Sequence, residues 1–150
     1  MPDIEGKLSE LGLALSDPHS PVGEYLGAKR CGRLVFVSGR VSEQRGVVGA
    51  DVSLEEAKIA ARDTALQLLS ITKQELGSLD PIASVECLRG FVRSAPDFTA
   101  QPQVIDGASA LLIALWGEKG RHARTATGVV QLPFGAALQI DMILSFAKGF

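Results

Sequence analysis

The residues that could do chemistry gather in the segment 120–142, which reads GRHARTATGVVQLPFGAALQIDM. Arg121, His122 and Arg124 open this segment, and a lone carboxylate, Asp141, lies near its end. The pattern predicts two strands joined by a Leu-Pro turn, and a β-hairpin brings its two ends back together. We therefore expect a site for a small anion with an acid or a base beside it.

Arg124 is the first candidate for a functional role. It is flanked by the small residues Ala123 and Thr125, so its guanidinium is free to bind a carboxylate or a phosphate through two parallel hydrogen bonds. The alternative is a surface ion pair with a neighbouring carboxylate.

Asp141 is the second candidate. Leu138, Ile140 and Met142 alternate with more polar residues around it, which places its side chain on the less apolar face of a strand. A buried carboxylate at this point would be suited to proton transfer. The alternative is a solvated carboxylate on an exposed strand face.

The other reactive residue types give weaker signals. His19 and His122 are too few and too far apart to indicate a metal site, and Cys31 and Cys87 have neither metal-ligand spacing nor the number needed for a disulfide framework. The glycines of residues 46–49 lack the lysine and the strand-to-helix context of a phosphate loop. The sequence therefore predicts neither a metal nor a nucleotide cofactor.

Length and charge narrow the class of protein. The chain has 150 residues and a formal net charge of −2 at pH 7, and it has no basic stripe, which disfavours nucleic acid as a partner. Its length favours one domain over residues 1–150, with residues 1–21 as an N-terminal helix and loop extension. The polar start and the lack of an apolar run of about 20 residues argue against a signal peptide and a membrane span, so we expect a cytoplasmic protein.

Hydrophobic periodicity and capping signals predict eight elements. Ser53 and Glu56 form a capping box that opens the longest helix, and Gly77 is suited to end it. A change of phase in the third strand indicates a bulge near Gly90. The expected elements are a helix within 3–15, a hairpin with strands 24–29 and 33–41, a helix over 54–76, a strand over 82–93, a helix from 102 or 103 to 116, and the two strands of the segment 120–142.

This order of elements is typical of an α+β domain in which two long helices pack on one face of a mixed sheet. The other face of the sheet still carries valine and isoleucine side chains, which must be covered. Another copy of the chain is the simplest cover, so we expect an oligomer.

Over residues 22–144 the sequence resembles the Rid family, also called YjgF and, in older usage, endoribonuclease L-PSP proteins. The N-terminal helix and the GRHAR segment resemble the subgroup labelled "YjgF/chorismate-mutase-like putative endoribonucleases". The motifs that match, in the family's order and spacing, are Gly23-Glu24-Tyr25, Val37-Ser38-Gly39, Ala123-Arg124, Leu132-Pro133 and Asp141.

The resemblance implies a chorismate-mutase-like (RidA-like) fold assembled as a homotrimer. It implies that Arg124 grips the carboxylate of a small metabolite and that Asp141, where the family usually has glutamate, positions a water molecule. Tyr25, Ser38 and Gly39 would bind substrate together with Arg124. The implied activity is that of the 2-iminobutanoate/2-iminopropanoate deaminases, which hydrolyse reactive enamines or imines of amino-acid metabolism to a 2-keto acid and ammonia in a subunit-interface pocket without a cofactor.

Other functions stay open on the sequence. The family's common cysteine is Ala126 here, its asparagine has no clear match among residues 101–103, and Asp141 is shorter than glutamate. These departures favour a non-catalytic trimer that binds a small carboxylated metabolite as a sensor or regulatory partner. Ribonuclease activity rests on the older family label and is disfavoured by the acidic composition, and chorismate mutase activity rests on likeness of fold, which does not carry function.

Overall fold

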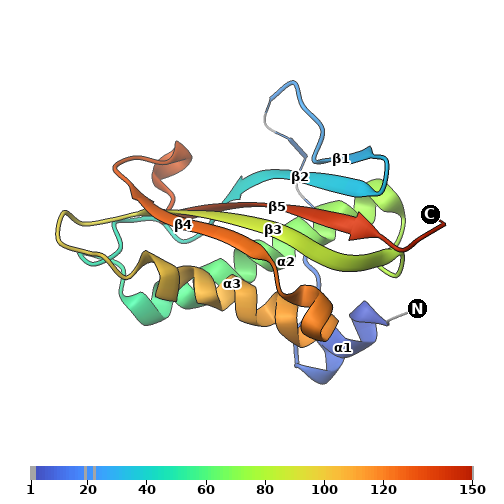
Figure 1. The fold of residues 1–150 in the computed structure, drawn as a ribbon. Coiled ribbons are helices and arrows are strands. Elements are labelled where there is room, and N and C mark those ends of the chain that lie inside the picture. The colour runs from blue at the N-terminus through green and yellow to red at the C-terminus, as the bar shows by residue number, and fades with distance from the viewer. Residues whose placement is uncertain (1–2, 19, 22, 150) are drawn as a thin grey trace.

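The computed structural model of the protein describes residues 3–18, 20–21 and 23–149, so His19 lies outside the described residues. A five-stranded mixed sheet forms one layer and the helices form the other (Figure 1). The elements follow the predicted order, with two added 3-10 turns. They are α1 (Ile4–Glu10), β1 (Ala28–Cys31), β2 (Leu34–Val41), α2 (Leu54–Leu76), β3 (Ile82–Arg93), α3 (Gln101–Trp116), η1 (Gly117–Gly120), β4 (Ala123–Val129), η2 (Pro133–Gly135) and β5 (Leu138–Phe146).

The strands lie in the order β1-β2-β5-β3-β4, and β3 with β4 forms the parallel pair of this sheet. The prediction that the segment 120–142 folds as a hairpin is therefore wrong. Helix α3 connects β3 to β4 as a crossover, which makes these two strands parallel and puts β4 at the sheet edge. The chain then crosses β3, and β5 is inserted antiparallel between β2 and β3. Alternating patterns identify strands, but they do not reveal which strands are neighbours.

Helix α2 begins and ends where the sequence predicted. The backbone N–H of Glu56 donates to Ser53 Oγ at 3.1 Å, and Gly77 adopts a left-handed conformation with φ of 86°. Ala57, Ala61 and Ala65 are fully buried, so small side chains bring this helix close to its neighbours. The predicted packing of two long helices on one sheet face is confirmed (Figure 1).

The strand irregularities differ from the prediction. In β3 the register shifts lie between Ile82 and Cys87, so the bulge expected near Gly90 is not found there. Gly90 instead makes room for α3, because a Cβ at this position would lie 2.4 Å from Ile105 Cδ1. A further shift occurs in β2 between Val37 and Arg40, at the Ser38-Gly39 step.

Helix α1 packs against the core beside α3. Ile4 and Leu8 are buried, and Lys7 Nζ donates to the carbonyl oxygen of Leu115 at 3.0 Å. Within the described part of the chain, no helix has the length and apolar character to cross a membrane.

All three α-helices lie on one side of the sheet, and no helix covers the other side (Figure 1). We call this uncovered side the open face. Leu34 and Phe36 of β2 are 38% and 43% exposed. Apolar side chains are therefore left unburied on this face within a single chain, and the exposed ones of β2 are leucine and phenylalanine, where valine and isoleucine were predicted.

Candidate functional site

Four of the five residues that the sequence analysis placed in the site line one pocket on the open face. They are Tyr25, Ser38, Gly39 and Asp141, and the pocket has a volume of about 690 Å³. We call it the Asp141 pocket. The fifth residue, Arg124, does not line it.

Asp141 is held by a cation that sequence reasoning missed. Arg89 of β3 lies directly opposite Asp141 of β5, and Arg89 Nε donates to Asp141 Oδ1 at 2.8 Å. The hydrogen bond with this carboxylate and its charge raise the pKa of Arg89 above its ordinary value. The Asp141 side chain is 16% exposed, so one carboxylate oxygen is tied while the group remains open to the pocket. Lys29 of β1 adds a second cation to the lining.

The Ser38-Gly39 step shapes the upper wall of this pocket. Ser38 Oγ donates to the carbonyl oxygen of Leu26 at 2.6 Å, and the Ser38 backbone N–H donates to Gly27 O at 2.9 Å. These two bonds anchor the loop that carries Tyr25, whose side chain is 44% exposed at the rim. The irregularity in β2 therefore brings the tyrosine to the same pocket as Asp141.

Arg124 belongs to a different group of polar side chains, between β4 and α3. Its Nη1 donates to Asp106 Oδ1 at 2.7 Å and to Ser109 Oγ at 3.2 Å, and its Nη2 donates to Pro102 O at 3.3 Å. Arg124, Asp106, Ser109 and His122 border a small pocket of about 230 Å³, and we call these four residues the Arg124 cluster. The ion pair with Asp106 is the alternative that the sequence analysis left open for Arg124.

His122 completes the Arg124 cluster. Its Nδ1 lies 2.6 Å from the carbonyl oxygen of Gly120, and because a carbonyl only accepts, Nδ1 carries the hydrogen. In the neutral ring Nε2 then accepts from Ser109 Oγ at 2.9 Å. Ser109 is therefore bonded to both His122 and Arg124, which fixes the direction of the guanidinium.

The register explains why Arg124 and Asp141 do not meet in one chain. Leu88 of β3 pairs with Arg124, and the next residue, Arg89, pairs with Asp141. Successive side chains of a strand point to opposite faces. Arg124 therefore faces the helices and Asp141 faces the open side. The opposite orientation of the two side chains depends on β3, which lies between β4 and β5. It could not be foreseen from the predicted hairpin, in which these two strands are direct neighbours.

Two signals could have found the missed residues. Arg89 lies one position from the buried Leu88 in a strand that alternates, which indicates an exposed cation in a central strand. Asp106 and Ser109 are three positions apart in a predicted helix and therefore lie on one side of it. Neither signal identifies the element against which these residues pack in the folded chain.

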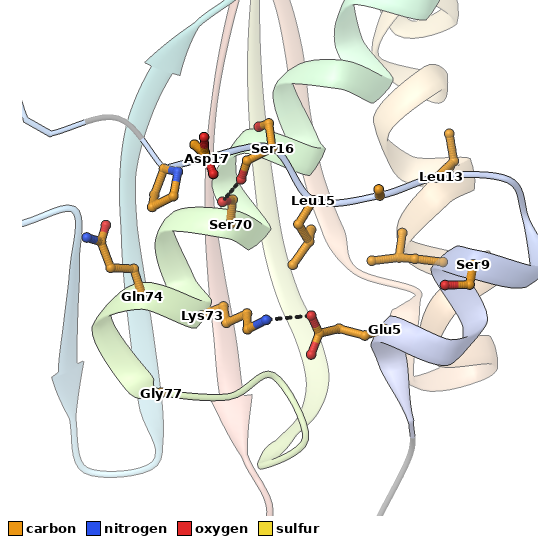
Figure 2. Close-up of a pocket in the computed structure, with 13 residues that line it drawn as sticks. Glu5, Ser9, Leu13, Leu15, Ser16, Asp17, Ser70, Lys73, Gln74 and Gly77 are labelled. Atoms are coloured by element: carbon orange, nitrogen blue, oxygen red, sulfur yellow. Dashed lines mark hydrogen bonds and ion pairs between the residues drawn. The ribbon is translucent and has the colours of Figure 1, made fainter.

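A further pocket of about 610 Å³ lies between α1, the segment 13–18 and α2 (Figure 2). Two of its polar side chains, Lys73 and Glu5, are paired with each other, since Lys73 Nζ donates to Glu5 Oε1 at 2.5 Å, and Ser70 Oγ donates to the backbone carbonyl oxygen of Ser16. None of the five predicted site residues lines it. Across the described ranges, no group of three or more His, Cys, Asp or Glu side chains could hold a metal ion.

Comparison with known families gives a match along nearly the whole chain. The family model described as "YjgF/chorismate mutase-like, putative endoribonuclease" matches residues 5–145. A relative, Protein TCP17 of Trypanosoma cruzi, is 38% identical over 148 residues, which cover 94% of this chain and 92% of the relative.

Solved structures give the same picture. A protein of unknown function from Agrobacterium tumefaciens is 40% identical, with a TM-score of 0.88 over 96% of this chain and 92% of that chain. A protein from Shewanella oneidensis described as a "putative endoribonuclease" is 26% identical, with a TM-score of 0.91 over 95% of this chain and 99% of that chain. RidA from an Antarctic Psychrobacter is 20% identical, with a TM-score of 0.53 over 87% of this chain and 94% of that chain, which shows likeness of fold alone.

Proposed function

We propose, from the premise that this chain belongs to the YjgF/chorismate mutase-like, putative endoribonuclease family, that it hydrolyses reactive enamines or imines of amino-acid metabolism. The products would be a 2-keto acid and ammonia. The active unit would be a homotrimer, and the reaction would take place in pockets between its subunits.

The observation that carries this proposal is the division of the site into two halves. The Asp141 pocket holds a carboxylate, a tyrosine and exposed backbone, and the Arg124 cluster holds a cation suited to a substrate carboxylate. In one chain they lie on opposite sheet faces, but β4 is an edge strand and the open face is uncovered. A second copy whose β4 edge lies against the open face would bring an Arg124 cluster to an Asp141 pocket.

In this arrangement each group has a defined role. Arg124 would hold the substrate carboxylate and so fix the imine carbon near Asp141, which removes much of the entropic barrier. Asp141 would accept a hydrogen from a water molecule and direct its oxygen at that carbon. Water adds across the C=N bond to give a carbinolamine, as the proton that Asp141 accepted passes to the nitrogen. The hydroxyl proton then moves to the nitrogen as the C–N bond breaks and the C=O bond forms, which releases ammonia and leaves the 2-keto acid. The backbone around Ser38 and Gly39 and the hydroxyl of Tyr25 would contact the other end of the substrate.

A second candidate function is metabolite binding without turnover. Arg89 and Lys29 already supply the Asp141 pocket with cations from the same chain, so a carboxylate has partners there without Arg124. Asp141 is committed to Arg89, and Ala126 stands where the family commonly has cysteine. A sensor or regulatory trimer would need only these contacts.

Ammonia release from freshly generated 2-aminoacrylate or 2-iminopropanoate tests the proposal. We expect the wild-type protein to accelerate it, and Arg124→Ala and Asp141→Asn each to lose at least about 100-fold, as is usual when a positioned catalytic group is removed. Co-expressing the two variants should restore one of the three pockets in each mixed trimer, which is about a quarter of all pockets when the subunits assemble at random, because each pocket would take one residue from each of two subunits.

The control is Arg62→Ala, since Arg62 pairs with its neighbour Asp63 on the exposed side of α2. Saturable binding of a 2-keto acid with no accelerated hydrolysis would contradict the enzymatic function and support metabolite binding without turnover. Full activity of the Arg124→Ala variant would contradict the mechanism, and the absence of any restored activity in the mixture would contradict a shared site. Incubation of the same preparation with RNA tests the endoribonuclease description of the family.

A further inference from the structure

A pocket at the free edge of β2 is lined by cations and amides that have no side-chain hydrogen bond to another described residue. Strand β1 pairs with β2 only as far as Val37, and beyond the bonds of Ser38 to Leu26 and Gly27 no described strand pairs with β2 on that side. The pocket beside this edge has a volume of about 420 Å³, within the range of small-molecule sites. We call it the Arg40 pocket. It shares Tyr25 and Gly39 with the Asp141 pocket, but neither Arg89 nor Asp141 lines it.

Arg40 is the strongest sign of a ligand. The register shift at Ser38-Gly39 pairs Arg40 with Ile140, whose side chain is buried under the helices, so Arg40 also faces α2. Its Nε is buried and has no hydrogen-bond partner among the described residues. A buried donor left unpaired destabilises the folded chain, and more so when the group is charged. An anion in the pocket would remove this destabilisation.

Gln67 of α2 lines the same pocket and is only 7% exposed. No hydrogen bond joins its amide to any residue that the structure describes. Unlike Arg40 Nε, its amide atoms are not fully buried, so they are open to the cavity. Two unpartnered groups from β2 and α2, one cationic and one an amide, therefore meet at one cavity.

The charges of the lining select the charge of the ligand. Arg40 and Arg45 contribute two positive charges and Glu43 contributes one negative charge, which leaves a net charge of about +1 for a bound group to neutralise. A monoanion fits this balance better than a dianion. A planar carboxylate also matches the fork of a guanidinium.

Two exposed aromatic side chains give the pocket an apolar mouth. Phe134 is 63% exposed in the η2 turn, and Tyr25 is 44% exposed. Phe134 has φ of 60°, a left-handed conformation that is unfavourable for a residue with a side chain and is often retained at ligand sites. The turn is anchored by Arg93 Nη1, which donates to Gly135 O at 3.3 Å. The chain therefore holds an aromatic ring at the pocket in an unfavourable backbone state.

We propose that the Arg40 pocket binds a monocarboxylate with a flat, apolar body, such as an aromatic carboxylate. Its oxygens bond to Arg40 and Gln67, and its body lies against Phe134 and Tyr25. This site does not depend on the imine hydrolysis proposed above.

Titration of the ¹⁵N-labelled full chain with benzoate tests the site, with acetate and phenyl phosphate as comparison probes. We expect benzoate to shift the amide signals of residues 40–45 and 133–135 saturably, and to bind more tightly than either comparison probe. Arg40→Met should raise the benzoate Kd about tenfold or more, since it removes a charged hydrogen-bond partner. Gln67→Leu should raise it severalfold, and Phe134→Ala should reduce the preference for benzoate over acetate.

Arg62→Met and Asp141→Asn are the controls and should leave the benzoate Kd unchanged, the second because Asp141 lies outside this pocket. The absence of a saturable shift would overturn the proposal, as would unchanged affinity in folded Arg40→Met and Gln67→Leu proteins. If Arg40→Met does not fold, the benzoate Kd of Gln67→Leu and of Arg45→Met tests the proposal in its place, and unchanged affinity in both would overturn it. Tighter binding of phenyl phosphate would overturn the carboxylate assignment. Shifts of the same signals on raising protein concentration alone would assign the pocket to a second copy instead.

Discussion

The ion pair between Arg89 and Asp141 orients the carboxylate that the proposed chemistry of the open face requires. The Arg89 side chain is 58% exposed, so this is a surface pair with one well-ordered partner. Pairs of this kind contribute about 0–1 kcal/mol to the free energy of unfolding. A role in binding or catalysis can therefore be separated from a role in stability.

Arg89→Met tests this separation. We expect the free energy of unfolding, measured by urea denaturation, to change by less than about 1 kcal/mol, because the aliphatic stem is retained and the lost pair is exposed. Imine hydrolysis or 2-keto acid binding should fall clearly, because Asp141 loses the group that orients it. Arg62→Met, which removes an ion pair that is exposed on both sides, is the control. A loss of several kcal/mol would instead show that the pair is structural.

Glu86 gives the chain a pH-dependent stability term on the same sheet face. Hydrogen bonds from Ser84 and then Ser145 lower the pKa of Glu86 below its ordinary value. In the folded chain Glu86 therefore binds its proton at a lower pH than in the unfolded chain. Its contribution is present above the unfolded pKa, about 4.3, and is lost as pH falls through the folded pKa.

We expect Glu86→Gln to be less stable than wild type at pH 7, with a difference that shrinks on acidification below about pH 4. Urea denaturation at a series of pH values measures both curves. Ser84→Ala should weaken the same pH dependence, because it removes the principal cause of the shift. If the difference in free energy of unfolding between wild type and Glu86→Gln is constant across this pH range, the Glu86 carboxyl is not the source of the pH dependence.

At the scale of the elements, the close contact of α2 and α3 sets the depth of the helical layer. Gly107 of α3 lies against the backbone of α2, and a Cβ at this position would come within 2.1 Å of the Lys58 carbonyl oxygen. Backbone cannot give way as a side chain does, so the two helices would have to separate. Helix α3 also carries Asp106 and Ser109, and its position therefore sets the direction of Arg124.

Gly107→Ala should lower the melting temperature, although alanine is the better helix former by about 1 kcal/mol. We expect the overpacking to cost about 1–3 kcal/mol and to outweigh that gain. Ala110→Gly, on the exposed side of α3, measures the helix-propensity term without the contact. A Gly107→Ala protein with a raised melting temperature would mean that the helices can part at no cost.

At the scale of the whole molecule, the open face is the surface that one chain leaves unfinished. Phe36 is 43% exposed there, in the middle of β2, and it lines the Asp141 pocket. An apolar sheet face beside an incomplete polar site is suited to an interface between copies. Assembly and function would then depend on the same surface.

Phe36→Lys should convert the proposed trimer into smaller species, because it places a charge on the face that the copies would share. Light scattering coupled to size-exclusion chromatography measures the mass directly. Ile59→Lys is the matched control, since Ile59 is 53% exposed on α2 and away from the sheet. A wild-type monomer, or a Phe36→Lys protein with unchanged mass, would contradict this interface.

The sequence by itself determined most of the elements and their order. Apolar periodicity and the caps at Ser53 and Gly77 are local signals, and local signals define helices and strands without knowledge of their neighbours. The motifs around Tyr25, Ser38 and Arg124 are also local signals, and they indicated the family without knowledge of the fold. The match over residues 5–145 then established the family.

Only the tertiary structure decided which residues meet. Strand order is set by the crossover through α3 and by the insertion of β5 between β2 and β3, and these depend on packing between distant segments. That order places Arg124 and Asp141 on opposite faces and pairs Asp141 with Arg89. Because neighbouring positions of a strand face opposite ways, a single intervening strand turned one predicted site into two.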